Sequence, residues 1–253
     1  MTTVNDILSY IDSFAPIASA MDFDNCGLLA GDRNKPVTRA LLALDITAEV
    51  VREAQALHCE LIISHHPVIF QPLKRLDARS VPYLLAAGGI AAVCMHTNLD
   101  LSEEFGVNLC LAKAAGVNAP VKSERGECLF IGTLPESAGI HDFAKTVKDA
   151  LDCAGLRYTA VRPAVKTVAV ASGAGGSDIF AAAAEGADVL ITGEIKHHEI
   201  NAANELGVNI IDTGHFKSED IVILPLQKKL SQHFPSICFT KSKEYSDKMN
   251  YLS

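Results

Sequence analysis

Short apolar runs alternate with segments of helical periodicity along this chain of 253 residues, and this alternation limits the folds open to it. Apolar runs predict strands at 39–45, 60–64, 90–95, 128–134, 167–172, 188–191 and 208–211. Helical spacing predicts helices near 4–14, 47–57, 81–87, 107–115, 140–153, 196–206 and 217–232. Strand–helix alternation is typical of mostly parallel or mixed sheets covered by helices. The predicted fold class is therefore α/β.

A polar stretch at 122–127 interrupts the alternation, which resumes after it. At roughly 100–200 residues per domain, the length fits one large domain or two modest ones. We therefore predict two α/β lobes, the first over 1–124 and the second over 125–253. The segment that holds His215 and Glu219 is expected to return to a site shared by the two lobes.

Composition excludes several classes of protein. Hydrophobic residues make up 49% and charged residues 21%, which argues against a disordered, collagenous or coiled-coil chain. The net charge of −8 is spread evenly, so binding to nucleic acid lacks its usual basic driving force. The seven cysteines form no Cys-x-x-Cys pair, and neither a secretory signal nor a membrane span is recognisable. We expect a reduced, cytoplasmic protein that does not bind membranes.

Two histidine-containing segments directly follow predicted strands in the first lobe. Ser64-His65-His66-Pro67 follows the run 61–63, and His96-Thr97-Asn98-Leu99-Asp100 follows the run 90–95. Functional groups of α/β proteins gather at the carboxyl ends of strands, which favours a functional interpretation. The alternatives are an exposed polar turn at 64–67 and helix capping by the polar residues of 97–100.

Two further segments follow strands in the second lobe. Residues 193–199 contain Glu194 and His198, and residues 212–219 contain His215 and Glu219. Each pair is spaced i, i+4, so a helical turn would place both side chains on one face, as helices do when they present two ligands to one ion. For 193–199 the alternative is a solvated first turn of a helix.

Together these strand ends supply a mixed set of imidazoles and carboxylates, namely His65, His66, Asp100, His215 and Glu219. Five protein ligands exceed the three or four that one catalytic zinc takes, so two divalent ions bridged by a carboxylate fit the set better. Nitrogen and oxygen ligands without thiolate suit iron, zinc, manganese or cobalt and do not choose among them.

These motifs resemble the type 2 GTP cyclohydrolase I homolog family. The resemblance rests on Asp-Asn-Cys-Gly-Leu-Leu at 24–29, Ile-Ile-Ser-His-His-Pro at 62–67, His-Thr-Asn-Leu-Asp at 96–100, Thr-Gly-Glu at 192–194 with His198, and Gly-His at 214–215 with Ser218 and Glu219. The motifs follow the family's order from residue 24 to 219. The sequence departs from the family pattern at Cys26, where the family often has valine.

The resemblance implies two interlocked α/β domains with a dinuclear metal site between them, in a homohexameric toroid. Position by position, the implied metal ligands are the same five residues, with His96, Glu194 and His198 lining the cavity as candidate catalytic residues. The leading hypothesis is a metal-dependent hydrolase of a nucleotide-like or other small polar substrate, with GTP suggested by the family's name and His96 as a proton carrier. The alternative is a non-catalytic metal-binding regulatory or interaction protein that assembles as a ring.

Two other segments have a structural and a functional interpretation. Residues 172–178, Ser-Gly-Ala-Gly-Gly-Ser-Asp, follow a strand and form either a tight strand-to-helix turn or a backbone site for an anionic group. Asp22 and Asp24 precede a glycine-containing turn, a position typical of turn-forming residues. Gly-x-Ser-x-Gly is absent, so covalent acyl chemistry has no support in the sequence.

Overall fold

The computed structural model describes residues 1–252 and divides into two compact units. Unit 1 comprises residues 1–105 and 223–246, and unit 2 comprises residues 106–222 and 247–252. Each unit is an α/β domain with its own sheet, which confirms the predicted fold class. Among residues 1–252, no helix combines the length and the apolar character needed to cross a membrane.

Unit 1 contains a five-stranded sheet in the order β1-β4-β3-β2-β11. Its strands are β1 (Gly27–Ala30), β2 (Arg39–Ala43), β3 (Leu61–Ser64), β4 (Ala91–Cys94) and β11 (Cys238–Lys241). All neighbours pair in parallel except β1, which runs antiparallel to β4. The carboxyl ends of β2, β3 and β4 therefore lie at the same end of the sheet as the amino end of β1.

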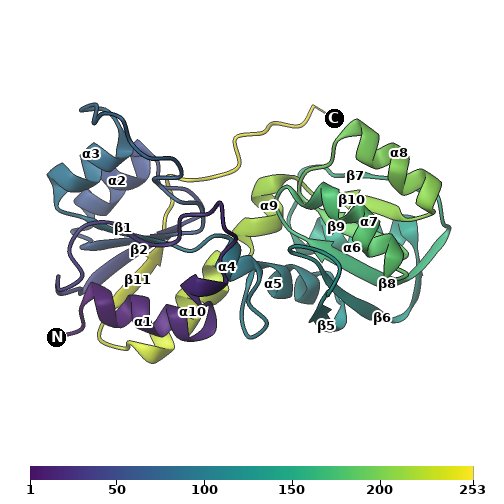
Figure 1. Cartoon of the computed structure of the whole chain (residues 1–253), viewed down its shortest axis with the longest axis horizontal. Coiled ribbons are helices and arrows are strands. Elements are labelled where there is room, and N and C mark those ends of the chain that lie inside the picture. Colours follow the sequence, from purple (N-terminus) through teal and green to yellow (C-terminus); the bar gives the residue numbers. More distant parts are fainter. Residues whose placement is uncertain (253) are drawn as a thin grey trace. The chain divides into compact units, whose positions relative to one another are not determined.

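Helices cover both faces of the unit 1 sheet, with α2 and α3 on one face and α1 and α10 on the other (Figure 1). The helices of this unit are α1 (Val4–Phe14), η1 (Ile17–Ser19), α2 (Ala48–Ala56), α3 (Val81–Gly88), α4 (Thr97–Asp100) and α10 (Ile223–His233). Thr3 and Asp6 form a capping box at α1, and the Thr47 side chain caps α2, as the sequence predicts. Leu41, Ala43 and Ile62 pack with the helices of one face.

Unit 2 contains a six-stranded mixed sheet in the order β5-β6-β8-β9-β10-β7. Its strands are β5 (Asn118–Lys122), β6 (Phe130–Gly139), β7 (Arg157–Tyr158), β8 (Ala164–Ala171), β9 (Val189–Thr192) and β10 (Asn209–Asp212). The three strands β8, β9 and β10 are parallel, so their carboxyl ends share one edge. The other pairings are antiparallel.

Two core clusters lie on opposite faces of the unit 2 sheet. The helices are α5 (Val107–Ala114), α6 (Ile140–Ala150), η2 (Gly175–Asp178), α7 (Ile179–Ala184), α8 (His197–Leu206) and α9 (His215–Asp220). Along β8, Val168 and Val170 pack with α5 and α6, whereas Ala169 and Ala171 pack with α7 and α8. This alternation is the two-residue period of a strand buried on both faces.

The chain divides elsewhere than at the predicted boundary between 124 and 125. The polar stretch 122–127 connects β5 to β6, which pair antiparallel within unit 2. The predicted helix over 217–232 is two helices, α9 in unit 2 and α10 in unit 1. Pro225 explains the break, because it has no N–H to bond the carbonyl of Ile221 and fits only the first turn of a new helix.

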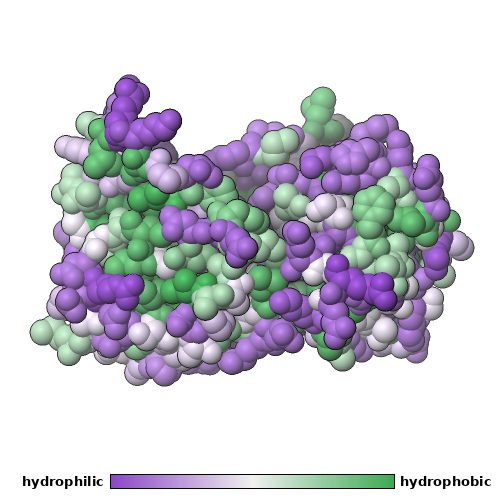
Figure 2. Space-filling model, viewed as in Figure 1, coloured by the Kyte–Doolittle hydropathy of each residue, from purple (hydrophilic) through white to green (hydrophobic). Residues whose placement is uncertain are grey.

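The surface of both units mixes residue types. On the face drawn in Figure 2, hydrophilic residues border hydrophobic ones in each unit. Large hydrophobic side chains that reach solvent in unit 1 include Phe23, Phe70 and Leu76. Phe23 and Phe70 lie edge to face with ring centroids 6.3 Å apart. A few exposed hydrophobic residues of this kind are ordinary on globular proteins.

Candidate metal centres

Unit 1 gathers three imidazoles at the carboxyl edge of its sheet. His65 and His66 directly follow β3, and His96 follows β4, the parallel neighbour of β3. One ligand atom from each of the three rings lies within 4.8 Å of the others. We call His65, His66 and His96 the histidine cluster. The cluster confirms that the strand ends of the first lobe converge, as the topology of parallel strands requires.

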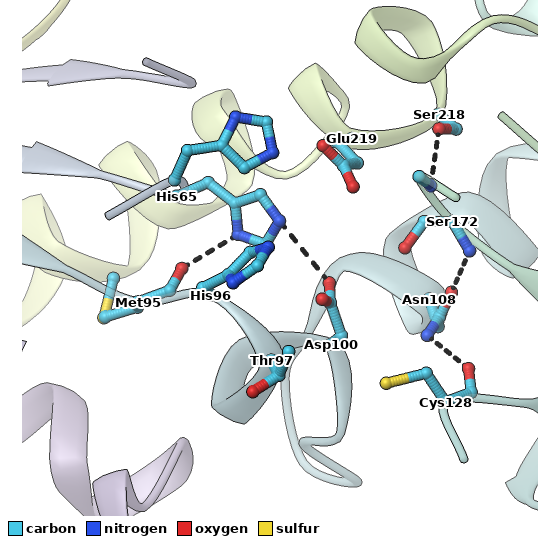
Figure 3. Close-up of polar contacts among 12 residues, drawn as sticks. His65, Met95, His96, Thr97, Asp100, Asn108, Cys128, Ser172, Ser218 and Glu219 are labelled. Carbon is cyan, nitrogen blue, oxygen red and sulfur yellow. Dashed lines mark hydrogen bonds and ion pairs between the residues drawn. The ribbon is translucent and has the colours of Figure 1, made fainter. Parts of the chain in front are cut away.

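Each ring of the histidine cluster is held through Nδ1. His65 Nδ1 lies 2.8 Å from the carbonyl oxygen of Met95, a contact drawn in Figure 3. His66 Nδ1 lies 2.9 Å from Asp45 Oδ1, and His96 Nδ1 lies 3.0 Å from Asp24 Oδ1. Carbonyl and carboxylate oxygens only accept hydrogen bonds, so each Nδ1 donates and, in the neutral ring, Nε2 carries the lone pair. This is the tautomer of histidines that bind metals through Nε2.

Asp100 completes the unit 1 group. It ends the short helix α4, which begins directly after His96, and it is buried. Its Oδ1 lies 3.6 Å from Nε2 of the buried His65 (Figure 3). Two ligands about 2.1 Å from one tetrahedral ion are roughly 3.4 Å apart, so this separation suits a shared ion.

Unit 2 places His215 between two glutamates. Nδ1 of His215 lies 2.8 Å from Glu194 Oε1, and Nε2 lies 3.0 Å from the buried Glu219 Oε2. The i, i+4 spacing of His215 and Glu219 on α9 brings these two side chains together as the sequence predicts. The hydrogen bond that the ring donates to Glu219 raises the pKa of His215 to about 9, against the opposing effect of burial, and Glu194 adds to the rise.

Tight backbone packing fixes the position of Glu219. The Gly173 N–H donates to Ser218 Oγ over 3.0 Å, the contact dashed at Ser218 in Figure 3. That hydroxyl in turn donates to the carbonyl of His215. Gly173 has a φ of +59°, and a Cβ there would meet the carboxylate of Glu219. A Cβ on Gly193 would meet the backbone at Gly173 and His215. The segment 172–178 is therefore a close-packed turn that needs glycine at 173, and its Gly173 amide is already bonded.

The structure places the three candidate catalytic residues differently. His96 belongs to the histidine cluster, and Glu194 contacts His215. His198 lies on α8 with 75% of its side chain exposed, and its Nε2 is 3.9 Å from Glu199 rather than beside His215 or Glu219. The i, i+4 pairing expected for Glu194 and His198 does not form, because α8 begins only at His197.

The sequence does not identify two carboxylates, Asp45 and Asp24, that contact rings of the histidine cluster. Asp45 follows β2 at the same sheet edge as His65 and holds His66, so the strand-end rule itself could have found it. Asp24 is interpreted from the sequence as a turn former, yet its fully buried side chain contacts His96. Its position depends on the antiparallel pairing of Gly27 with Cys94, which brings the segment before β1 to the end of β4.

A family model described as Duf34/NIF3 (NGG1p interacting factor 3) matches residues 2–247. The chain belongs to the DUF34/NIF3 family. Curated relatives carry the name GTP cyclohydrolase 1 type 2 homolog, which confirms the family predicted from the motifs. One from Clostridium perfringens (strain 13 / Type A) is 34% identical, with 98% of this chain and 99% of the relative aligned. One from Clostridium acetobutylicum is 30% identical over 90% of this chain and 89% of the relative.

Solved structures of DUF34/NIF3 relatives share the fold. A hypothetical protein from Staphylococcus aureus superposes with a TM-score of 0.90 at 28% identity, covering 99% of both chains. A Bacillus cereus protein related to NIF3 superposes with a TM-score of 0.88 at 26% identity, also over 99% of both chains. The two-sheet architecture of this chain is therefore that of its family.

The donor chemistry of both DUF34/NIF3 units fits a metal ion. Imidazole and carboxylate ligands suit zinc, iron, manganese and cobalt, and the tautomers needed for binding through Nε2 are fixed by Met95, Asp45 and Asp24 in unit 1. In unit 2, Glu194 holds Nδ1 of His215 in the same way. The residues of unit 1 could therefore hold a metal, and His215 and Glu219 of unit 2 supply further donor atoms of the same kinds.

Proposed function

We propose that this protein is a metal-dependent hydrolase with a dinuclear site in each subunit, acting on a nucleotide-like or other small polar substrate. The ligands would be His65, His66 and Asp100 from unit 1 and His215 and Glu219 from unit 2. Ligand number supports two ions, because five protein ligands exceed those of a single catalytic ion. The names of the curated relatives make GTP the first substrate to test.

One observation carries the proposal. The three proposed histidine ligands and the neighbouring His96 are all held by an acceptor at Nδ1. His65 is held by a carbonyl, and His66, His96 and His215 are held by carboxylates. Metal-ligating histidines almost always have such a partner on the ring nitrogen that does not bind the metal. Four anchored rings at the strand ends of two sheets are therefore best explained by metal binding.

The residues of the chain that are not proposed ligands have separate proposed roles. Divalent ions in such a site supply Lewis acidity and lower the pKa of water towards neutrality. His96 is the proposed proton carrier, because its ring belongs to the histidine cluster without being one of the five proposed ligands. Glu194 orients His215 through Nδ1. We assign no role to His198, whose exposed ring contacts Glu199.

Metal content tests the ligand assignment. Protein prepared without oxygen should hold close to two ions per chain, and His65→Ala and Glu219→Ala should each lose metal while keeping the wild-type circular dichroism spectrum. His197→Ala is the matched control, because His197 is an exposed histidine whose ring contacts Asn201. Wild-type metal content in both ligand variants would contradict the proposed site.

Turnover tests the hydrolase assignment. The same metal-loaded samples are offered GTP, with formate release as the readout, and then a phosphodiester and a cyclic amide. We expect one of these to be consumed by the wild type and the His197→Ala control but not by His65→Ala. No turnover of any probe by fully loaded protein would count against the hydrolase.

A second candidate is a metal-binding interaction or regulatory protein, and the family description favours considering it, since it names an interacting factor. The family resemblance also supports a homohexameric toroid. Light scattering of the purified protein should then give about six times the 27.0 kDa of one chain. Loaded protein that is inert towards every probe yet retains a protein partner in a pull-down would favour this candidate.

A further inference from the structure

Asp24 is a buried carboxylate surrounded by donors in unit 1. Its side chain is fully buried, whereas the two preceding residues, Asp22 and Phe23, are exposed. Oδ1 accepts from the Asn25 N–H over 2.7 Å and from His96 Nδ1 over 3.0 Å. The first of these hydrogen bonds is local, to the next residue along the chain. The second reaches a residue 72 positions away in the sequence.

The second carboxylate oxygen is equally occupied. Oδ2 accepts from the Thr97 N–H over 2.9 Å, from Thr97 Oγ1 over 2.6 Å and from the Cys26 thiol over 3.1 Å. Thr97 Oγ1 is oriented for this donation because it accepts from the Met21 N–H. Burial raises the pKa of Cys26 to about 12, so the sulfur keeps the proton that it donates.

These hydrogen bonds keep Asp24 ionised. Burial opposes ionisation, but the hydrogen bonds from His96, Thr97 and Cys26 outweigh it and hold the pKa of Asp24 well below its usual range. An ionised carboxylate has no proton to give, so the His96 Nδ1 must be the donor. The same carboxylate holds the ring of His96 and the backbone of Thr97, which fixes the ring relative to its own chain segment.

We propose that Asp24 is the positioning residue of His96: it fixes the ring orientation and the Nδ1–H tautomer, so that Nε2 presents its lone pair within the histidine cluster. The consequence for catalysis rests on the proposed function, in which His96 carries a proton at Nε2. The positioning itself is a property of the resting protein. An orienting carboxylate of this kind determines which ring nitrogen can accept a proton.

Asp24→Asn removes the charge and keeps the shape. In either orientation of the amide, an N–H group replaces an oxygen that now accepts from two or three donors. Oδ2 accepts from three donors and Oδ1 from two, so the amide N–H group is favoured at the Oδ1 position, where it faces His96 Nδ1. Nδ1 must then accept, so the Nε2–H tautomer of His96 should become populated. Asp22→Asn is the matched control, an identical change at an exposed site two residues away.

The tautomer is read from solid-state NMR of metal-free protein labelled with ¹⁵N-histidine, at about pH 8, above the ordinary imidazole pKa. His96→Gln identifies the His96 signals by difference. We expect only the Nδ1–H form in the wild type and in Asp22→Asn, and a new Nε2–H population in Asp24→Asn. A wild-type His96 in the Nε2–H form, or an unchanged Nδ1–H form in Asp24→Asn, would overturn the proposal.

The wild-type spectrum alone tests the tautomer of His96, even if Asp24→Asn fails to fold. Where a probe substrate is turned over, Asp24→Asn should lower kcat by on the order of 10²-fold or more at wild-type metal content, as expected when proton transfer is impaired. Wild-type kcat in the folded variant would overturn the catalytic consequence. Failure of every probe with the wild type would instead count against the hydrolase and leave the tautomer result standing.

Discussion

In unit 1, His65 donates its Nδ1 proton to the uncharged carbonyl of Met95, whereas in unit 2 His215 lies between the carboxylates of Glu194 and Glu219. The unit 1 group is rich in imidazole and buried, because His65, Asp24 and Asp100 are shielded from solvent. The unit 2 group is rich in carboxylate, and 60% of the Glu194 side chain is exposed.

His65 and His215 therefore differ in what a metal ion must do to bind the ring. The carbonyl of Met95 fixes the tautomer of His65. Two carboxylates fix the ring and also raise the pKa of His215 to about 9, so an ion must displace a proton at neutral pH. We expect metal binding through His215 to weaken as the pH falls below about 9.

The largest expected effect comes from removing the charge of a partner carboxylate. Asp45→Asn should weaken metal binding by roughly 10–100-fold, the usual cost of losing the partner of a ligating histidine. Glu194→Gln should fall at the lower end of that range, because Glu194 is 60% exposed while Asp45 is 33% exposed and therefore less screened by water. Competition with a chromophoric chelator measures both affinities.

Asp22→Asn serves as the control for this pair, since Asp22 is an exposed aspartate in a turn of unit 1. Its affinity for metal should equal that of the wild type. A larger loss in Glu194→Gln than in Asp45→Asn would reverse the comparison between the two units and show that exposure does not govern these partners.

Burial also separates the strands that the sequence predicts from those that it does not. Runs of apolar residues predicted β2, β3 and β4 in unit 1 and β6, β8, β9 and β10 in unit 2, all flanked by strands on both sides. The strands not predicted, β1, β5, β7 and β11, are the edges of the two sheets. These edge strands are partly exposed, so their sequences lack the continuous apolar run of a central strand.

The site shows the same limit. Spacing within one segment predicted the pairing of His215 with Glu219, since i, i+4 geometry is local. The contacts of Asp24 with His96 and of Asp45 with His66 join residues from different strands, so they depend on sheet topology. Glu194 and His198 were expected to share a helical face, but the helix begins too late, and helix ends are the least predictable part of an element.

A smaller effect should distinguish steric crowding from backbone strain in unit 2. Gly173 and Gly186 both have positive φ, at +59° and +77°, so alanine at either position costs about 1–2 kcal/mol of stability. A Cβ at Gly186 meets nothing within 4 Å, whereas at Gly173 it meets the Glu219 carboxylate. Gly173→Ala should therefore lose about 1–3 kcal/mol more than Gly186→Ala.

Metal affinity provides the second measurement for this pair. Displacement of Glu219 should make Gly173→Ala bind metal more weakly, while Gly186→Ala keeps the wild-type affinity despite its lower melting temperature. Equal stability losses and equal affinities in the two variants would mean that the Glu219 carboxylate moves aside freely, and the close packing around it would then have no part in holding the ligand.

The smallest expected effect is the pH dependence of the metal-free protein. The folded-state pKa of His215 is raised to about 9 from the ordinary 6.5, so the protonated ring stabilises the fold. This contribution is fully present below pH 6.5 and is lost as the pH rises through about 9. The melting temperature of the metal-free wild type should therefore fall between pH 7 and pH 10 by more than that of Glu219→Gln, in which the main partner of the charged ring is neutral. An identical fall in both proteins would show that His215 is not the group responsible.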